Sequence, residues 1–122
     1  MKWMVTGWMM EERHFYMRLS RHPLSASAQA LWHVLMSKGN SAYWHFPVKV
    51  RTYELAGILN LSVTSIKNAR RELVTEGYML YHNGTGRQPA SYYMLSLVNE
   101  GQLMFNAQRP DSSAALENET KQ

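Results

Sequence analysis

The stretch Leu55–Leu73, LAGILNLSVTSIKNARREL, decides the fold of this chain. Its apolar residues recur at helical spacing on both sides of a break, which predicts two short helices that share a buried face. These apolar anchors are Leu55, Ala56, Leu59, Ile66, Ala69 and Leu73. Asn60 lies at the break, where Asn tolerates a left-handed backbone, and Ser62 can cap the second helix. The stretch therefore has the register of a helix-turn-helix motif.

The second helix of this motif, expected from about Val63 to Glu76 and closed by Gly77, has an outward face of polar and basic residues. Such a helix enters the major groove of DNA, where side chains contact base edges and phosphates. The residues expected to contact bases are Ser65, Lys67 and Asn68. The residues expected to contact phosphates are Ser62, Thr64 and Arg71. The alternative interpretation of this face is a solvated helix surface without a ligand.

Thr52, just before the motif, and Arg70, within it, are expected to have local structural roles. Thr52 is the expected cap of the first helix. Arg70 lies towards the buried side of the second helix. Either its aliphatic stem extends along the core, or its guanidinium pairs with Glu54 or Glu72.

The flanking sequence adds helices and β-like runs around the motif. Helices are expected at Glu11–Ser20 and from a cap at Ser25 or Ser27 to a stop at Gly39-Asn40. The β-like runs are Tyr43–Val50, which Pro47 restricts to a short or edge strand, Tyr78–His82 and Ser91–Leu97. This order predicts an α+β fold of the winged helix-turn-helix type, with a three-helix core and a small antiparallel β-wing.

The expected organisation is an N-terminal extension with a possible short helix over 1–23, a winged helix domain over 24–98 and a mostly disordered acidic tail over 99–122. The wing is the glycine-rich loop that starts at Asn83-Gly84, a hairpin signal. Within it, Thr85 and Arg87 are candidates for contact with DNA. Lys49 and Arg51, just before the motif, are further phosphate candidates, and a solvated edge strand is the alternative for them. A hairpin that only needs its glycines to turn is the alternative for the loop.

The amino terminus is rich in tryptophan and methionine, which are too apolar to be left in water. Its candidate oligomerisation residues are Trp3, Trp8, Met9 and Met10. They either cover the core of their own domain or pair with a second copy, which predicts a homodimer or a higher homo-oligomer.

Composition excludes several classes of protein. The chain of 122 residues carries a formal net charge of +4, and its basic residues are concentrated before Val98, which fits a nucleic-acid partner. It has no cysteine and no apolar run of membrane-spanning length, so we expect a soluble, cytoplasmic protein without membrane contact. The five histidines show no ligand spacing, and no catalytic constellation is present. We therefore expect no enzyme, no metal and no cofactor.

Two segments resemble a known family. Leu24–Met36 looks like the opening helix, and Leu61–Tyr78 like the recognition helix, of the amino-terminal winged helix domain of DnaD-like replication proteins, which include phage replisome organisers. The resemblance covers about Phe15 to Leu97. Its most specific positions are Ala69, Arg70, Glu72, Leu73 and Gly77. It implies binding of double-stranded DNA, self-association, and a role in replication initiation or primosome assembly beside proteins such as a helicase or helicase loader.

Two other functions remain as alternatives. A small winged helix transcriptional regulator would recognise one palindromic operator. A protein-interaction or oligomerisation module, which is a different class, would show no salt-dependent affinity for DNA at all.

Overall fold

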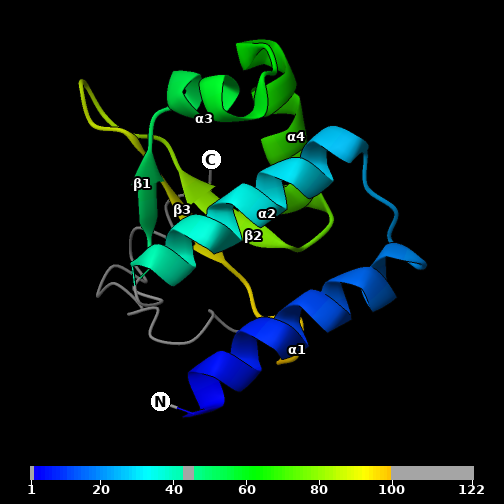
Figure 1. Ribbon diagram of the computed structural model, residues 1–122. Coiled ribbons are helices and arrows are strands. Elements are labelled where there is room, and N and C mark those ends of the chain that lie inside the picture. Colours follow the sequence, from blue (N-terminus) through cyan, green and yellow to red (C-terminus); the bar gives the residue numbers. More distant parts are fainter. Residues whose placement is uncertain (1, 43–45, 100–122) are drawn as a thin grey trace.

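The computed structural model describes the backbone of residues 2–42 and 46–99 and, within these ranges, the side chains from Trp8 onward. These residues form four helices and three strands in an α+β arrangement (Figure 1). The helices are α1 (Lys2–Leu19), α2 (Ala26–Ser41), α3 (Thr52–Leu59) and α4 (Val63–Thr75). The strands are β1 (Val48–Val50), β2 (Met79–His82) and β3 (Ala90–Met94). The tail expected at 99–122 lies outside the described residues beyond Asn99.

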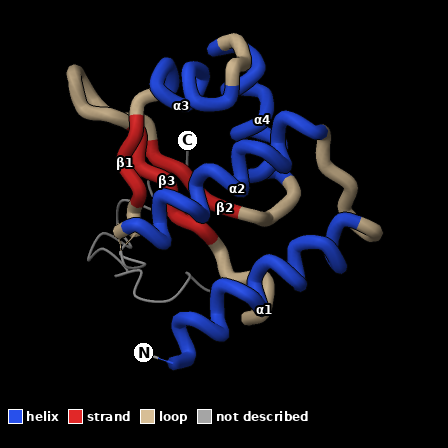
Figure 2. Tube along the Cα trace, viewed as in Figure 1, coloured by secondary structure: helices blue, strands red, loops and turns tan. Residues whose placement is uncertain are grey.

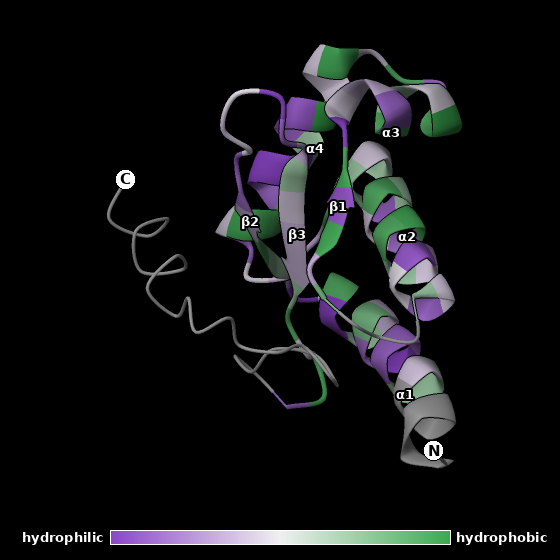
Figure 3. Cartoon of the chain, turned by 90° about the vertical axis from the view of Figure 1, so that its left-hand side faces the viewer, coloured by the Kyte–Doolittle hydropathy of each residue, from purple (hydrophilic) through white to green (hydrophobic). Residues whose placement is uncertain are grey.

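The strands form one antiparallel sheet in the order β1-β3-β2. β1 lies at the edge, as Pro47 predicts, and it is shorter than the run from Tyr43. Helices α2 and α4 contact one face of the sheet, which Figure 3 views from the other side, with the strands in front of α4. The sheet therefore keeps one face away from the helical core.

The helical pair α3–α4 has the predicted geometry. Leu55, Ile66 and Leu73 are fully buried, and Asn60 has a left-handed backbone with φ of 56°. Ser62 caps α4, because its hydroxyl accepts a hydrogen bond of 3.0 Å from the Ser65 amide. The expectation for the first helix is wrong: Arg51 occupies the cap position of α3, without a side-chain cap, and Thr52 is already helical.

Helix α2 runs through the centre of the core. Ser25 caps it, as expected, and its Trp32 side chain is fully buried. The Phe15 ring from α1 stacks on Trp32 with 4.0 Å between ring centroids. Helix α1 thus adds a fourth helix to the core of three that the sequence predicts, and it begins at Lys2 rather than Glu11.

The expected helix stop at Gly39-Asn40 is also wrong, because α2 continues to Ser41. Gly39 has a packing role instead. A Cβ atom at this position would lie 2.6 Å from Cζ of Phe46, whose ring is buried. The glycine therefore allows the segment before β1 to approach the helix closely.

Polar contacts fix the middle and the carboxyl end of α1. Near its middle, the buried Glu11 carboxylate accepts hydrogen bonds from the Ser96 hydroxyl at 2.5 Å and the Leu97 amide at 2.6 Å. These bonds tie α1 to the chain that follows β3.

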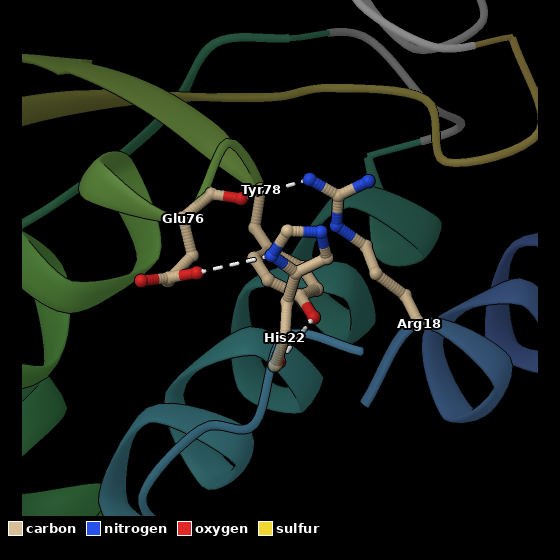
Figure 4. A network of polar contacts seen from close by, with 4 residues as sticks. All are labelled: Arg18, His22, Glu76 and Tyr78. Carbon is tan, nitrogen blue, oxygen red and sulfur yellow. Dashed lines mark hydrogen bonds and ion pairs between the residues drawn. The ribbon is translucent and has the colours of Figure 1, made fainter. Parts of the chain in front are cut away.

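The carboxyl end of α1 is held by the cluster in Figure 4. Arg18 Nη2 donates to the Glu76 carbonyl at 2.9 Å, and the Tyr78 hydroxyl donates to the His22 carbonyl at 3.1 Å. His22 Nδ1 lies 3.4 Å from a Glu76 carboxylate oxygen. Burial raises the pKa of Tyr78, although the neighbouring Arg18 guanidinium opposes this shift. The cluster connects α1 to the end of α4 and the start of β2.

Candidate nucleic-acid interface

Helix α4 separates its apolar and polar residues cleanly between two faces. Ile66, Ala69 and Leu73 are buried against α2 and α3. The side chains on the opposite face are exposed: Thr64, Lys67, Asn68 and Arg71. Because Lys67 and Arg71 are four residues apart, their cationic groups lie on one side of the helix, one turn from each other. Four of the six predicted contact residues of α4 thus lie on a common solvent-facing surface.

The other two predicted contact residues are engaged in the cap. The Ser62 hydroxyl accepts from the Ser65 amide and donates to the Ser65 hydroxyl at 2.9 Å. The Ser65 side chain is half-buried. Their hydroxyl groups define the start of α4 and would have to exchange these bonds to contact DNA.

A groove of about 370 Å³ separates α4 from the loop that joins β2 and β3, residues 83–89. Val63 and Lys67 from α4 and Arg51 and Tyr53 from the start of α3 line the groove. The loop contributes Asn83, Gly84, Gln88 and Pro89 to its lining. Figure 2 shows this loop projecting beyond the sheet at the end nearest α3. Residues of α4 and of the loop therefore line the same groove.

A hydrogen bond fixes the loop beside the helical pair. Arg51 Nη2 donates to the carbonyl oxygen of Arg87 at 2.6 Å, so the cap residue of α3 holds the backbone of the loop. The Thr85 and Arg87 side chains are exposed. Three predicted cations therefore meet in one region: Lys67 and Arg51 in the groove, and Arg87 on the loop.

The groove is free of carboxylates among the residues that the structure places along it. The nearby glutamates have partners elsewhere. Glu54 of α3 lies 3.5 Å from the Lys38 ammonium. Glu72 of α4 accepts bonds from the Ser25 amide and hydroxyl at 2.7 and 2.8 Å. The electrostatic character of the groove is set by its cations.

Arg70 is not part of this surface, since its side chain is only 7% exposed. Its guanidinium donates to the Tyr92 hydroxyl at 3.0 Å and to the Thr52 hydroxyl at 3.3 Å. It also lies 4.4 Å from the centroid of the Tyr81 ring, a cation–π distance. The two expected partners, Glu54 and Glu72, are bound to other groups, so Arg70 connects α4 to the sheet and to the start of α3.

Lys49 is exposed, but it does not line the groove. It lies on β1 between the buried Val48 and Val50, and side chains alternate between the two faces of a strand. Its side chain is therefore on the face of the sheet away from the helices, and the structure does not bring it together with Lys67.

The candidate oligomerisation residues are distributed along α1. Trp8 is half-buried and packs against the chain's own core, and Met10 is half-buried too. Met9 is 64% exposed. The Trp3 side chain lies outside the described residues.

Sequence reasoning missed Tyr53, which is 69% exposed beside the groove. Its place two residues before Leu55 was the available signal, because helical spacing puts Tyr53 off the apolar face formed by Leu55, Ala56 and Leu59. Gln88 and Pro89 were missed as well, since only the fold brings the end of the loop opposite α4.

Within residues 2–42 and 46–99, no three His, Asp or Glu side chains are grouped to hold a metal ion. Of the helices described, none combines the length and apolar character needed to cross a membrane. Comparison with protein-family models, curated proteins and solved structures found no match to this chain.

Proposed function

We propose that this chain is a winged helix protein that binds duplex DNA, with α4 as the recognition helix and residues 83–89 as the wing. The support for this fold assignment is the order α2-β1-α3-α4-β2-β3, with a tight turn at Asn60 and a loop between the last two strands. A helix-turn-helix pair followed by a β-hairpin presents one helix and one loop on the same side of a domain.

The observation that carries the proposal is the groove itself. It joins the exposed face of α4 to the loop, it contains Arg51 and Lys67, and no carboxylate lies among its described lining residues. DNA is a polyanion, and the cations that contact its backbone supply most of the sequence-independent affinity. Asn68 and Lys67 on α4 also have the donor groups that can bond to adenine and guanine edges in a major groove.

The role in replication initiation or primosome assembly, and the self-association that accompanies it, is part of the same proposal. Its support is the resemblance of Leu24–Met36 and Leu61–Tyr78 to DnaD-like domains. A regulator of transcription would use the same surface on a single operator, so enrichment of one palindromic site from random sequence would favour that role instead.

The test is duplex binding by fluorescence anisotropy, with pooled random-sequence DNA at several salt concentrations. We expect affinity to fall steeply with salt. Lys67→Gln and Arg71→Gln should each reduce the slope of log K against log salt by about 0.9, which corresponds to roughly 8-fold weaker binding at 0.1 M salt than the wild type. Circular dichroism would check that both variants keep the fold.

The matched control is Arg13→Gln, which removes one exposed cation from α1 and changes the net charge equally. It should leave the affinity and the slope unchanged. If the wild type fails to bind duplex at low salt, the chain is not a DNA-binding protein and the interaction module becomes the better hypothesis. If it binds but neither α4 variant changes the affinity, α4 is not the recognition helix.

A further inference from the structure

A second, smaller pocket lies on the other side of the loop. Its volume is about 190 Å³, and its side walls include Lys49, Ser91 and His82. These three residues form one row across the sheet, because Lys49 pairs with Ser91 and Ser91 pairs with His82 in the strand register. The row before it, Val48-Tyr92-Tyr81, faces the helices, so the side-chain alternation of the strands places this row on the face of the sheet turned away from the helices.

The chemistry of this outer pocket suits an oxyanion. Lys49 contributes an ammonium group with three donors, Ser91 a hydroxyl and His82 an imidazole that can donate through a ring nitrogen. No acidic residue is among the described side chains that line the pocket. Adjacent strands are about 4.8 Å apart, so the long Lys49 stem can bring its ammonium over Ser91 towards His82.

The outer pocket and the groove share the base of the loop. Asn83, Gly84, Gln88 and Pro89 line both of them. The groove lies on the α4 side, with Lys67 and Arg51, and the outer pocket lies on the side of the sheet turned away from the helices, with Lys49 and His82. The loop therefore projects between two cationic sites that face in different directions.

This arrangement matches the two phosphate backbones that border a DNA groove. A loop that enters the minor groove, about 6 Å wide, has one strand of the duplex on each side of it. We propose that the outer pocket binds a backbone phosphate of the DNA strand on the side of the loop opposite α4, through Lys49, Ser91 and His82. This inference rests on the proposed binding of duplex DNA, and it extends the interface beyond the helix-turn-helix pair to the outer face of the sheet.

The test compares Lys49→Gln, Lys49→Arg and the control Arg13→Gln in the same anisotropy assay, across a salt series. The Lys49 side chain is exposed, so its replacement leaves the core intact. Lys49→Gln should lower the slope of log K against log salt by about 0.9 and weaken binding by roughly 8-fold at 0.1 M salt. Lys49→Arg should restore both quantities, and Arg13→Gln should leave them at the wild-type values.

A second measurement identifies the source of the phosphate. Amide chemical shifts of Ser91 and His82 would be followed by NMR during titration with a short duplex and, separately, with inorganic phosphate. Shifts that saturate with duplex and weaken in Lys49→Gln support the proposal. Saturable shifts with inorganic phosphate alone would identify a site for a small free anion and overturn it.

The failures of the two proposals are distinguishable. If the wild type binds no duplex at any salt concentration, the proposed function is wrong. If the wild type binds and Lys67→Gln weakens binding, while Lys49→Gln keeps the wild-type affinity and slope, DNA binding stands and the outer pocket is not part of the interface.

Discussion

Replacement of Glu11 tests how α1 is attached to the rest of the molecule. Its carboxylate is 2% exposed and accepts bonds from the Ser96 hydroxyl and the Leu97 amide. Glu11→Ala removes the acceptor and leaves two buried donors without it. Each unsatisfied buried donor costs about 1–3 kcal/mol, so we expect the free energy of unfolding to fall by about 3 kcal/mol.

Glu11→Gln separates the loss of the acceptor from the loss of the charge. The amide has the same shape, its carbonyl can accept from the Leu97 amide, and its NH₂ group can donate to the Ser96 oxygen. The Ser96 hydroxyl proton loses its charged acceptor, but the Leu97 amide keeps one, so the expected loss is about 1 kcal/mol, smaller than for Glu11→Ala. The expected order of stability is therefore wild type, then Glu11→Gln, then Glu11→Ala.

The assay is urea unfolding followed by tryptophan fluorescence, with thermal unfolding as a second readout. At roughly 4 °C per kcal/mol for a domain of this size, Glu11→Ala should lower Tm by about 12 °C and Glu11→Gln by about 4 °C. The control is Glu12→Ala, since Glu12 is a neighbour in the same helix, and one of its carboxylate oxygens lies 3.8 Å from the His33 ring in a part-exposed contact. It should cost less than about 1 kcal/mol. A Glu11→Ala variant as stable as this control would refute the role of the two hydrogen bonds.

Further predictions concern two helical glycines and Tyr78. Gly→Ala in a helix interior normally stabilises by about 0.5–1 kcal/mol, and we expect that gain for Gly57→Ala, where a Cβ would meet nothing within 4 Å. Gly39→Ala should instead lose about 1–3 kcal/mol in urea unfolding, because the new Cβ overlaps the buried Phe46 ring, and the same sign at both positions would contradict this packing. Burial raises the pKa of Tyr78. The contribution of its hydroxyl to the free energy of unfolding is therefore complete below about pH 10 and is lost as the pH rises through the folded-state pKa. Tyr78→Phe should cost about 1 kcal/mol near neutral pH through the lost bond to His22, and urea unfolding should show the gap to wild type shrinking above about pH 10 rather than staying constant.

The parts of the fold that the sequence predicts are those with local causes. The turn at Asn60 and the cap at Ser62 depend on residues within a few positions of each other, and both have the expected geometry. The buried face of α4 follows from helical spacing alone. For the same reason the exposed face of α4, with Lys67 and Arg71, could be identified before any tertiary contact was known.

The parts that could not be predicted depend on contacts between distant segments. Arg70 is bonded to Tyr92 of β3, a partner that only the sheet brings near, whereas the sequence suggested Glu54 or Glu72 as its partner. Gly39 resembled a helix stop because nothing local revealed the Phe46 ring against it. The length of α1 was missed because the Trp- and Met-rich start has no clear polar face, and its attachment depends on Ser96 and Leu97, far along the chain.

The long-range contacts also determine where the charged side chains lie. Every glutamate in the described part of the chain has an internal partner: Glu11, Glu12, Glu54, Glu72 and Glu76. None of these partners is a cation of the exposed α4 face or of the loop. Lys38 is the one permanent cation among these partners, so the negative charge of the glutamates stays on α1, on α3 and on the side of α4 near the start of α2. The exposed cations of α4 and the loop are partners of none of these glutamates, and they lie on the surface where the proposed interface requires positive charge.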